Sequence, residues 1–223
     1  MSNVTRISRF GFVNAYLVRE EDGLTVIDTM LPGSAKKIVA AAAELSAPIR
    51  RIVLTHAHGD HIGSLDQLAA AVPDAEVIIG EREARLLQKD FTMEADEADW
   101  PKRRGGFSGA STKPTRTLVE GERVGSLEAI ATPGHTPGHL AFLDTRDRTL
   151  FTDDVFSTLG GTAVSARMNP RFPLIYMGTW NRPVDAASAR KLREREPARI
   201  APGHGKILDS PLAAMDAAIA RVG

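Results

Sequence analysis

The sequence predicts a layered α/β fold, and three observations carry this prediction. The 223-residue chain opens with two β-rich runs at 10–18 and 24–28, joined by a short turn of acidic residues and glycine. From residue 34 to residue 89, segments with helical spacing of apolar residues alternate with short apolar runs typical of buried strands. Strand patterns resume at residue 117. Alternation of this kind is typical of sheets that are covered by helices.

The spacing of apolar residues defines the predicted elements one by one. Ser34 stands where it would cap the first helix, and Pro48 follows the end of that helix. Ser210, with Pro211 at the first helical position, stands in the same way before the last helix. In chain order, helices are predicted at 34–45, 61–72, 81–89, 184–194 and 210–222. After the opening pair, strands are predicted at 49–55, 76–79, 117–119, 123–124, 127–131, 140–143, 149–152 and 199–201.

Residues 91–117 break this regular pattern. Aromatic residues, acidic residues, three consecutive cations and several glycines are scattered there without a clear period. A loop of this length inside a compact domain is unusual and often functional. We therefore expect a lid or pocket-wall insertion within a single domain spanning 1–223, with disorder as the alternative.

The composition argues against several classes of protein. Lys and Arg together number 28 and Asp and Glu also number 28, so no global positive field is present to hold a nucleic acid. The chain lacks any long uncharged apolar run, which argues against a membrane span. Its first residues lack the apolar core of a signal peptide, so we expect a cytoplasmic protein. Because there is no cysteine, any metal must be held by nitrogen and oxygen ligands.

The most informative stretch is Thr55-His56-Ala57-His58-Gly59-Asp60-His61, which places three imidazoles and a carboxylate within six residues. It lies between a predicted strand and a predicted helix, where α/β proteins often bind ligands. Side chains two residues apart on extended backbone point to the same side, and the start of the helix redirects the last two donors. Imidazole and carboxylate are donors that zinc accepts, and the cluster exceeds the needs of one ion that keeps an open coordination site. The alternative is a solvated polar turn.

Other donor residues follow strands or turns in the same way. His135 follows Pro133-Gly134, His204 follows Pro202-Gly203, and Asp153 and Asp154 end a predicted strand. Asp28 ends the second strand of the opening pair, where it is placed either to orient a ligand histidine or to serve as a turn residue. The same order of strand, turn and metal-binding side chain thus recurs along the chain. This recurrence predicts that loops far apart in the sequence supply the ligands of one metal site.

Together these motifs resemble those of the metallo-β-lactamase superfamily of binuclear metallohydrolases. The shared motifs are H-A-H-G-D-H at 56–61, T-P-G-H at 132–135, L-F-T-D-D at 150–154 and A-P-G-H-G at 201–205, preceded by V-N-A-Y-L-V at 13–18 and L-T-V-I-D-T at 24–29. The resemblance spans the chain. It implies a four-layer αββα sandwich and two divalent metal ions, with zinc expected first and manganese or iron as alternatives.

The resemblance also implies a role for each donor. One metal would be held by His56, His58 and His135, the second by Asp60, His61 and His204, and both by a bridging aspartate. The family's bridging aspartate usually follows a glycine, and this chain has Asp153 where that glycine would stand. Asp154 is the matching ligand, and a choice between the two aspartates stays open. His139 is left over, and we expect it to pack or to hydrogen-bond a ligand from behind.

The implied chemistry is hydrolysis by a hydroxide that two metals activate, with Asp60 or Asp154 relaying the proton. We expect a small-molecule substrate, an ester, lactone or thioester, with Tyr176, Arg171 and Trp100 as candidate binding residues. Members of the family that act on glutathione thioesters carry a helical substrate-binding extension at the carboxyl terminus. Only 19 residues follow His204 here, so the resemblance implies that glutathione thioesters are not the substrate. The alternatives are a phosphodiesterase or nuclease on the same site and a mononuclear iron oxidoreductase acting on sulfur compounds. The natural substrate and the choice between monomer and homodimer stay open.

Overall fold

The computed structural model describes residues 3–97, 101 and 104–222. Its contacts divide the chain into two compact units. The first unit comprises Met1–Asp90 and Phe107–Leu118, and the second comprises Phe91–Gly106 and Val119–Gly223. Each unit contains one six-stranded sheet with helices of its own, so the predicted α/β class is confirmed. The prediction of a single domain with an insertion near 91–117 stays a prediction.

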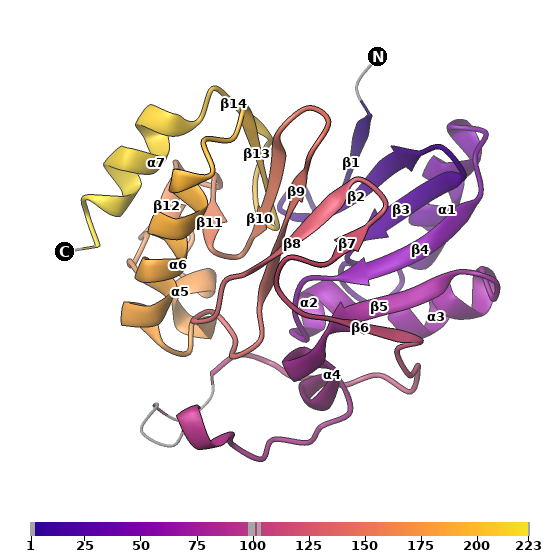
Figure 1. Ribbon diagram of the computed structural model, residues 1–223, viewed down its shortest axis with the longest axis horizontal. Coiled ribbons are helices and arrows are strands. Elements are labelled where there is room, and N and C mark those ends of the chain that lie inside the picture. The colour runs from indigo at the N-terminus through magenta and orange to yellow at the C-terminus, as the bar shows by residue number, and fades with distance from the viewer. Residues whose placement is uncertain (1–2, 98–100, 102–103, 223) are drawn as a thin grey trace. The chain divides into compact units, whose positions relative to one another are not determined.

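The first unit is built on a sheet in the order β1-β2-β3-β4-β5-β6 (Figure 1). The first three strands pair antiparallel, and β3 to β6 pair parallel. The strands are β1 Val4–Arg9, β2 Val13–Glu20, β3 Gly23–Ile27, β4 Ile49–Leu54, β5 Glu76–Gly80 and β6 Arg116–Leu118. The helices are α1 Ala35–Glu44, α2 Gly59–Ile62, α3 Leu65–Ala71 and α4 Glu81–Leu87. Parallel strands bring their carboxyl ends to one edge of the sheet, and the loop after β4 carries the histidine motif there.

Two predictions for this unit are wrong in detail. Ser34 stands at the N-cap position of α1, but its hydroxyl donates to the carbonyl of Leu31 at 2.7 Å instead of capping the helix. The predicted helix at 61–72 is two helices, α2 and α3, separated by Gly63 and Ser64. The Ser64 hydroxyl donates to the same Leu31 carbonyl at 2.7 Å and accepts from the Ser34 backbone at 2.7 Å. These tertiary hydrogen bonds are invisible to local periodicity.

The second unit is built on a sheet in the order β14-β13-β10-β9-β8-β7, with a separate two-stranded ribbon, β11-β12 (Figure 1). Its strands are β7 Arg123–Val124, β8 Leu127–Ala131, β9 Leu140–Asp144, β10 Thr149–Asp153, β11 Phe156–Ser157, β12 Ala163–Val164, β13 Arg199–Pro202 and β14 Leu208–Asp209. Its helices are α5 Leu174–Gly178, α6 Arg182–Glu194 and α7 Leu212–Ile219, with a short 3-10 turn at Ala95–Glu97. Residues of β8, β9, β10, α6 and α7 share one apolar core.

Strands β10 and β13 are parallel neighbours, so their ends deliver Asp154 and His204 to one edge. The pair contains an irregularity: β10 advances three residues, from Leu150 to Asp153, while β13 advances two, from Ile200 to Pro202. An extra residue of this kind is a β-bulge, which re-aims the side chains beyond it.

The last helix is shorter than predicted. α7 begins at Leu212, Pro211 occupies the N-cap position, and Ser210 lies before it with a left-handed φ of 48°. The predicted cap by Ser210 is therefore wrong. Among the described residues, no helix combines the length and the apolar character that crossing a membrane requires.

Candidate metal centre

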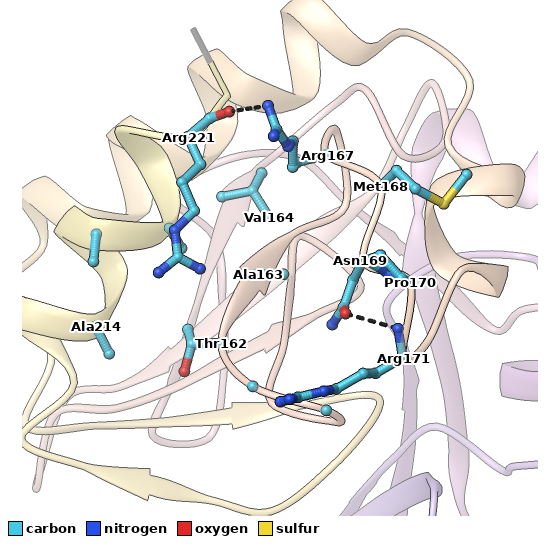
Figure 2. Close-up of a pocket in the computed structure, with 14 residues that line it drawn as sticks. Thr162, Ala163, Val164, Arg167, Met168, Asn169, Pro170, Arg171, Ala214 and Arg221 are labelled. Carbon is cyan, nitrogen blue, oxygen red and sulfur yellow. Dashed lines mark hydrogen bonds between the residues drawn. The ribbon is translucent and has the colours of Figure 1, made fainter.

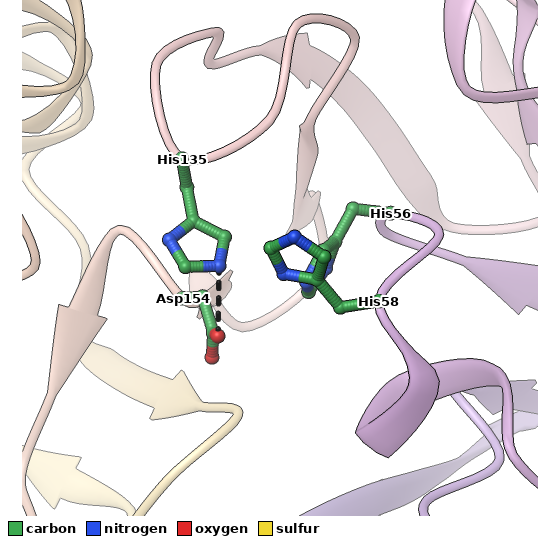
Figure 3. Close-up of side chains that lie close together, drawn as sticks. All are labelled: His56, His58, His135 and Asp154. Carbon is green, nitrogen blue, oxygen red and sulfur yellow. Dashed lines mark ion pairs between the residues drawn. The ribbon is translucent and has the colours of Figure 1, made fainter. Parts of the chain in front are cut away.

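The loop after β4 gathers the histidine motif of the first unit. The rings of His56 and His58 lie 4.7 Å apart between centroids, and those of His56 and His61 lie 4.3 Å apart. One ring nitrogen of His56 lies within 4.8 Å of one of His58, and the same holds for His56 and His61. All three histidines are buried. Figure 3 shows His56 and His58 projecting from this loop.

Asp60 completes the donors of the first unit. Its Oδ2 lies 3.7 Å from Nε2 of His61, and its side chain is 36% exposed while that of His61 is fully buried. Water can therefore reach the carboxylate of Asp60 from outside the loop. A carboxylate in contact with both a histidine and solvent is suited to exchange protons with bulk water.

Asp28 fixes this loop from behind. One of its carboxylate oxygens accepts from the Thr55 backbone at 2.9 Å, and the other accepts from the Thr55 hydroxyl at 2.8 Å and lies 3.1 Å from Nδ1 of His61. An ionised carboxylate only accepts hydrogen bonds, so Nδ1 of His61 carries the proton. The Thr55 hydroxyl gives its proton to Asp28, so at 3.1 Å it accepts from Nδ1 of His56. Both histidines are thus held as the tautomer whose basic nitrogen is Nε2, the arrangement of metal-ligand histidines.

Glu83 is a second support that sequence reasoning missed. It lies on α4, is fully buried, and accepts a hydrogen bond from the Ala57 backbone at 2.8 Å. This bond crosses 26 positions of sequence and fixes the residue between His56 and His58. No local signal marks Glu83, since it reads as one of several acids on an amphipathic helix.

In the second unit, Asp154 lies between two histidines. Its Oδ2 is 3.1 Å from Nε2 of His135, and its Oδ1 is 3.3 Å from Nε2 of His204. The dashed line in Figure 3 marks the first of these contacts. All three side chains are buried. Each oxygen of one carboxylate therefore faces a different histidine.

These separations fit a bound metal ion. Ligand atoms about 2.0–2.1 Å from a tetrahedral zinc lie about 3.3 Å from one another. The two contacts of Asp154 and the contact of Asp60 with His61 span 3.1 to 3.7 Å. The donors are imidazole nitrogen and carboxylate oxygen, which suit zinc, iron and manganese. Within each unit the chain thus offers donors of the right chemistry at coordination distances.

His135 is also held from behind. Its Nδ1 lies 3.0 Å from the hydroxyl of Thr179, and that hydroxyl donates to the Ile175 carbonyl at 2.8 Å. The single hydroxyl proton is therefore committed, so Nδ1 of His135 donates and Nε2 is its basic nitrogen. The sequence did not mark Thr179, which lies 44 positions from the histidine that it holds.

Asp185 of α6 lies behind Thr179. It accepts from the Ser165 hydroxyl at 2.7 Å, and the Ser165 carbonyl, at 3.3 Å, shares the Thr179 hydroxyl proton with the nearer Ile175 carbonyl. Burial raises the pKa of the Asp185 carboxyl to about 7, against the lowering effects of His135 and of the Ser165 hydrogen bond. A carboxyl that titrates near neutrality thus lies in the hydrogen-bonded chain that supports His135.

Two glycines directly beside the candidate histidines have a left-handed backbone, Gly134 before His135 and Gly205 after His204. Gly134 has a φ of 129°, and a Cβ there would lie 2.2 Å from the backbone nitrogen of Asp185. Gly205, directly after His204, has a φ of 109°, and a Cβ there would lie 2.3 Å from the Thr158 hydroxyl. Only glycine satisfies both the left-handed backbone and the close approach. The chain beside each histidine thereby packs closely against its neighbours, Asp185 at Gly134 and Thr158 at Gly205.

Asp153 occupies the position where the resemblance expects glycine. Its φ is 43°, a left-handed conformation that glycine adopts at no cost and that Asp tolerates better than most residues. Its Oδ2 lies 3.4 Å from Nε2 of His139, whose Nδ1 lies 2.7 Å from the Thr132 hydroxyl. Asp153 therefore faces His139, while Asp154 faces His135 and His204.

The predicted substrate residues have different surroundings. Trp100 lies outside the described residues. Tyr176 is half-buried on α5, with the guanidinium carbon of Arg182 3.8 Å from its ring centroid. Arg171 is exposed and lines a cavity of the second unit. The substrate-binding roles of these three residues stay predictions, as do the orienting roles of Asp28 and His139.

Comparison with known proteins identifies the family. The model of the metallo-beta-lactamase superfamily matches residues 8–204, a range that includes every predicted metal donor. Uncharacterized protein YobT of Bacillus subtilis (strain 168) is 48% identical over 207 residues, covering 93% of this chain and 89% of that protein. Hydroxyacylglutathione hydrolase of Rhodospirillum rubrum is 33% identical over 154 residues. That match covers 65% of this chain and 48% of the enzyme, so the chain spans about half the length of this relative.

Solved structures share the fold. BLEG-1 B3 metallo-beta-lactamase superposes with a TM-score of 0.72 at 21% identity, covering 96% of both chains. TTHA1623, solved in a di-iron-bound form, superposes with a TM-score of 0.69 at 26% identity, covering 94% of this chain and 96% of that one. These matches confirm the predicted metallo-β-lactamase fold. With the family model covering most of its length, the chain belongs to the metallo-β-lactamase superfamily of metal-dependent hydrolases.

Proposed function

We propose that the chain is a binuclear hydrolase acting on a small ester, lactone or thioester. In this proposal one metal ion is held by His56, His58 and His135, and the second by Asp60, His61 and His204. Asp154 supplies the ligand common to both. The single observation that carries the proposal is the carboxylate of Asp154, whose two oxygens face His135 and His204 separately.

The same observation favours Asp154 over Asp153 as the bridging ligand. The proposal assigns His135 and His204 to different metals, and a carboxylate that offers one oxygen to each neighbourhood is suited to join them. Asp153 is directed to His139, which lies outside the proposed ligand set. Asp153 then acts as a support that fills the position of the family's glycine.

Two metal ions, when bound, supply an activated water as nucleophile and an electrophile for the substrate oxygen. The residues of the chain hold the ligands in place and move protons. Asp28, Thr55 and Thr179 fix the tautomers of three histidines, so that Nε2 of each is the ligand atom. Asp60 is partly exposed, and it is therefore placed to pass a proton between the site and solvent.

Zinc is the proposed metal, because it readily binds both imidazole nitrogen and carboxylate oxygen, the two kinds of donor that the chain offers. Iron and manganese accept the same donors. The di-iron form of TTHA1623 supports keeping iron as the first alternative. Elemental analysis of the purified protein decides between them.

For the substrate, the relatives named hydroxyacylglutathione hydrolase support a thioester within the proposed class. The supporting matches cover less than half of those enzymes, 48% and 46% of their lengths. The test is a panel of esters, lactones, thioesters and one bis-aryl phosphate, assayed with the metal-loaded protein before and after chelation. We expect hydrolysis of at least one acyl substrate that chelation abolishes and added metal restores.

Two alternatives predict different results. A phosphodiesterase would cleave the bis-aryl phosphate in preference to every acyl substrate. A mononuclear iron oxidoreductase would contain one iron per chain, and the binuclear proposal would then be wrong. Full activity in a chelated sample that contains no metal would also overturn the proposal.

We further propose a cytoplasmic location and a small-molecule substrate, with neither nucleic acid nor membrane as partner. Balanced numbers of cations and anions support the exclusion of nucleic acid, since polyanion binding relies on a positive field. Gel filtration decides between monomer and homodimer.

A further inference from the structure

The second unit contains a cavity of about 490 Å³ between the loop after β11 and the end of α7. This volume falls within the range of small-molecule sites. Its lining includes Arg167, Arg171 and Arg221, and none of the lining residues is acidic (Figure 2). None of them belongs to the proposed metal-ligand set either.

The three arginines lack carboxylate partners among the described residues. Arg167 donates to the carbonyl of Arg221 at 2.8 Å, which satisfies a backbone acceptor just beyond α7. No described acidic side chain pairs with Arg171 or Arg221, although other arginines of this unit pair with acids, as Arg193 does with Asp216. Three positive charges thus surround one cavity without a counter-charge in its lining. Like charges gathered in this way repel one another, and an anion relieves the repulsion.

The remaining lining is suited to a ligand with an apolar part. Val164, Met168 and Ala218 contribute apolar surface, while the hydroxyl of Thr162 and the amide of Asn169 are polar. Figure 2 shows the side chains of Arg171 and Arg221 extending into the region where Thr162 lies. Guanidinium groups match the geometry of phosphate oxygens through paired hydrogen bonds.

We propose that this cavity is a binding site for a small organic phosphate monoester, with Arg171 and Arg221 binding the phosphate and the apolar wall contacting the organic group. Arg167 adds positive charge and fixes the backbone at the end of α7. The site is independent of the metal donors, and its existence does not depend on which substrate is hydrolysed.

Isothermal titration of the metal-loaded protein tests the proposal with phenyl phosphate as the probe. We expect one site per chain that binds phenyl phosphate more tightly than inorganic phosphate, because the apolar wall contributes only to the former. Arg171→Met and Arg221→Met keep the aliphatic stem and remove the charge, and each should weaken binding about 10-fold or more. The matched control is Arg190→Met. Arg190 is an exposed residue of α6 that lies outside the cavity lining, so its replacement should leave phenyl phosphate binding unchanged.

A bound phosphate could instead lie on the metals, and His135→Ala separates the two locations. Under the proposal His135→Ala keeps phenyl phosphate binding, while the double variant Arg171→Met/Arg221→Met loses it with metal content and melting temperature unchanged. Binding that survives the double variant but disappears in His135→Ala would overturn the proposal. Benzoate binding as tightly as phenyl phosphate would overturn the assignment to phosphate. Ala217→Glu places a negative charge in the lining at an exposed helix position and should also weaken binding.

Discussion

Asp185 should make the stability of this protein fall as the pH rises from acid to neutral. Burial raises its carboxyl pKa from 3.8 to about 7 in the folded chain. Between these two values the folded state holds a proton that the unfolded state has released, so the free energy of unfolding decreases with pH. The stabilisation by protonated Asp185 is fully present below pH 3.8 and is lost once the pH passes about 7.

Asp185→Asn removes this titration while keeping the size of the side chain and an oxygen that can accept from Ser165. One pKa unit corresponds to about 1.4 kcal/mol, so from pH 4.5 to pH 7.5 the wild type should lose about 3 kcal/mol relative to the variant. The assay is urea unfolding followed by circular dichroism at several pH values. A chelator is present throughout, because metal release at low pH would otherwise contribute.

The matched control is Asp209→Asn, since that carboxylate belongs to the same unit but its side chain is 83% exposed. We expect the difference in free energy of unfolding between wild type and Asp209→Asn to be the same at every pH. If the difference in free energy of unfolding between wild type and Asp185→Asn is also independent of pH, burial does not raise the pKa of Asp185 and the prediction is wrong.

Three further predictions concern the metal donors. His58→Ala should lower both the metal content per chain and the hydrolytic rate, and an unchanged metal content by elemental analysis would remove His58 from the ligand set. Thr179→Val removes the acceptor for Nδ1 of His135 and should weaken metal affinity about 10- to 100-fold in a chelator competition, whereas Thr179→Ser should retain it; equal affinities for the two variants would contradict the role of the hydroxyl. Asp153→Gly should keep its metal and Asp154→Asn should lose it, and the reverse result would make Asp153 the bridging ligand.

The candidate metal donors can be picked out from the sequence because each motif is local. Each candidate donor or group of donors directly follows a strand or the turn after it, so the order along the chain reveals them. The supports of those donors are not local. Asp28 lies 33 positions from His61, and Thr179 lies 44 positions from His135. Pairings of this kind arise from the sheet and helix arrangement, which a single sequence does not specify.

The errors in the predicted elements have the same origin. A continuous helix at 61–72 satisfies the apolar periodicity, but Ser64 interrupts it through hydrogen bonds to Leu31 and Ser34. Strand β1 has no alternating pattern, because its buried apolar residues Val4 and Ile7 lie three positions apart, and sequence patterning does not predict it. The antiparallel pairing of β1 with β2, from Val4 opposite Val18 to Arg9 opposite Val13, is what identifies it as a strand.

The bulge in β10 has a consequence for how this chain can change in length. Deleting one residue between Leu150 and Asp153 would restore an even ladder with β13, in which both strands advance by two. Because neighbouring side chains of a strand point to opposite faces, Asp154 would then turn away from His135 and His204. The additional residue of β10 therefore sets the face on which Asp154 lies, and we expect this stretch to tolerate no change in length.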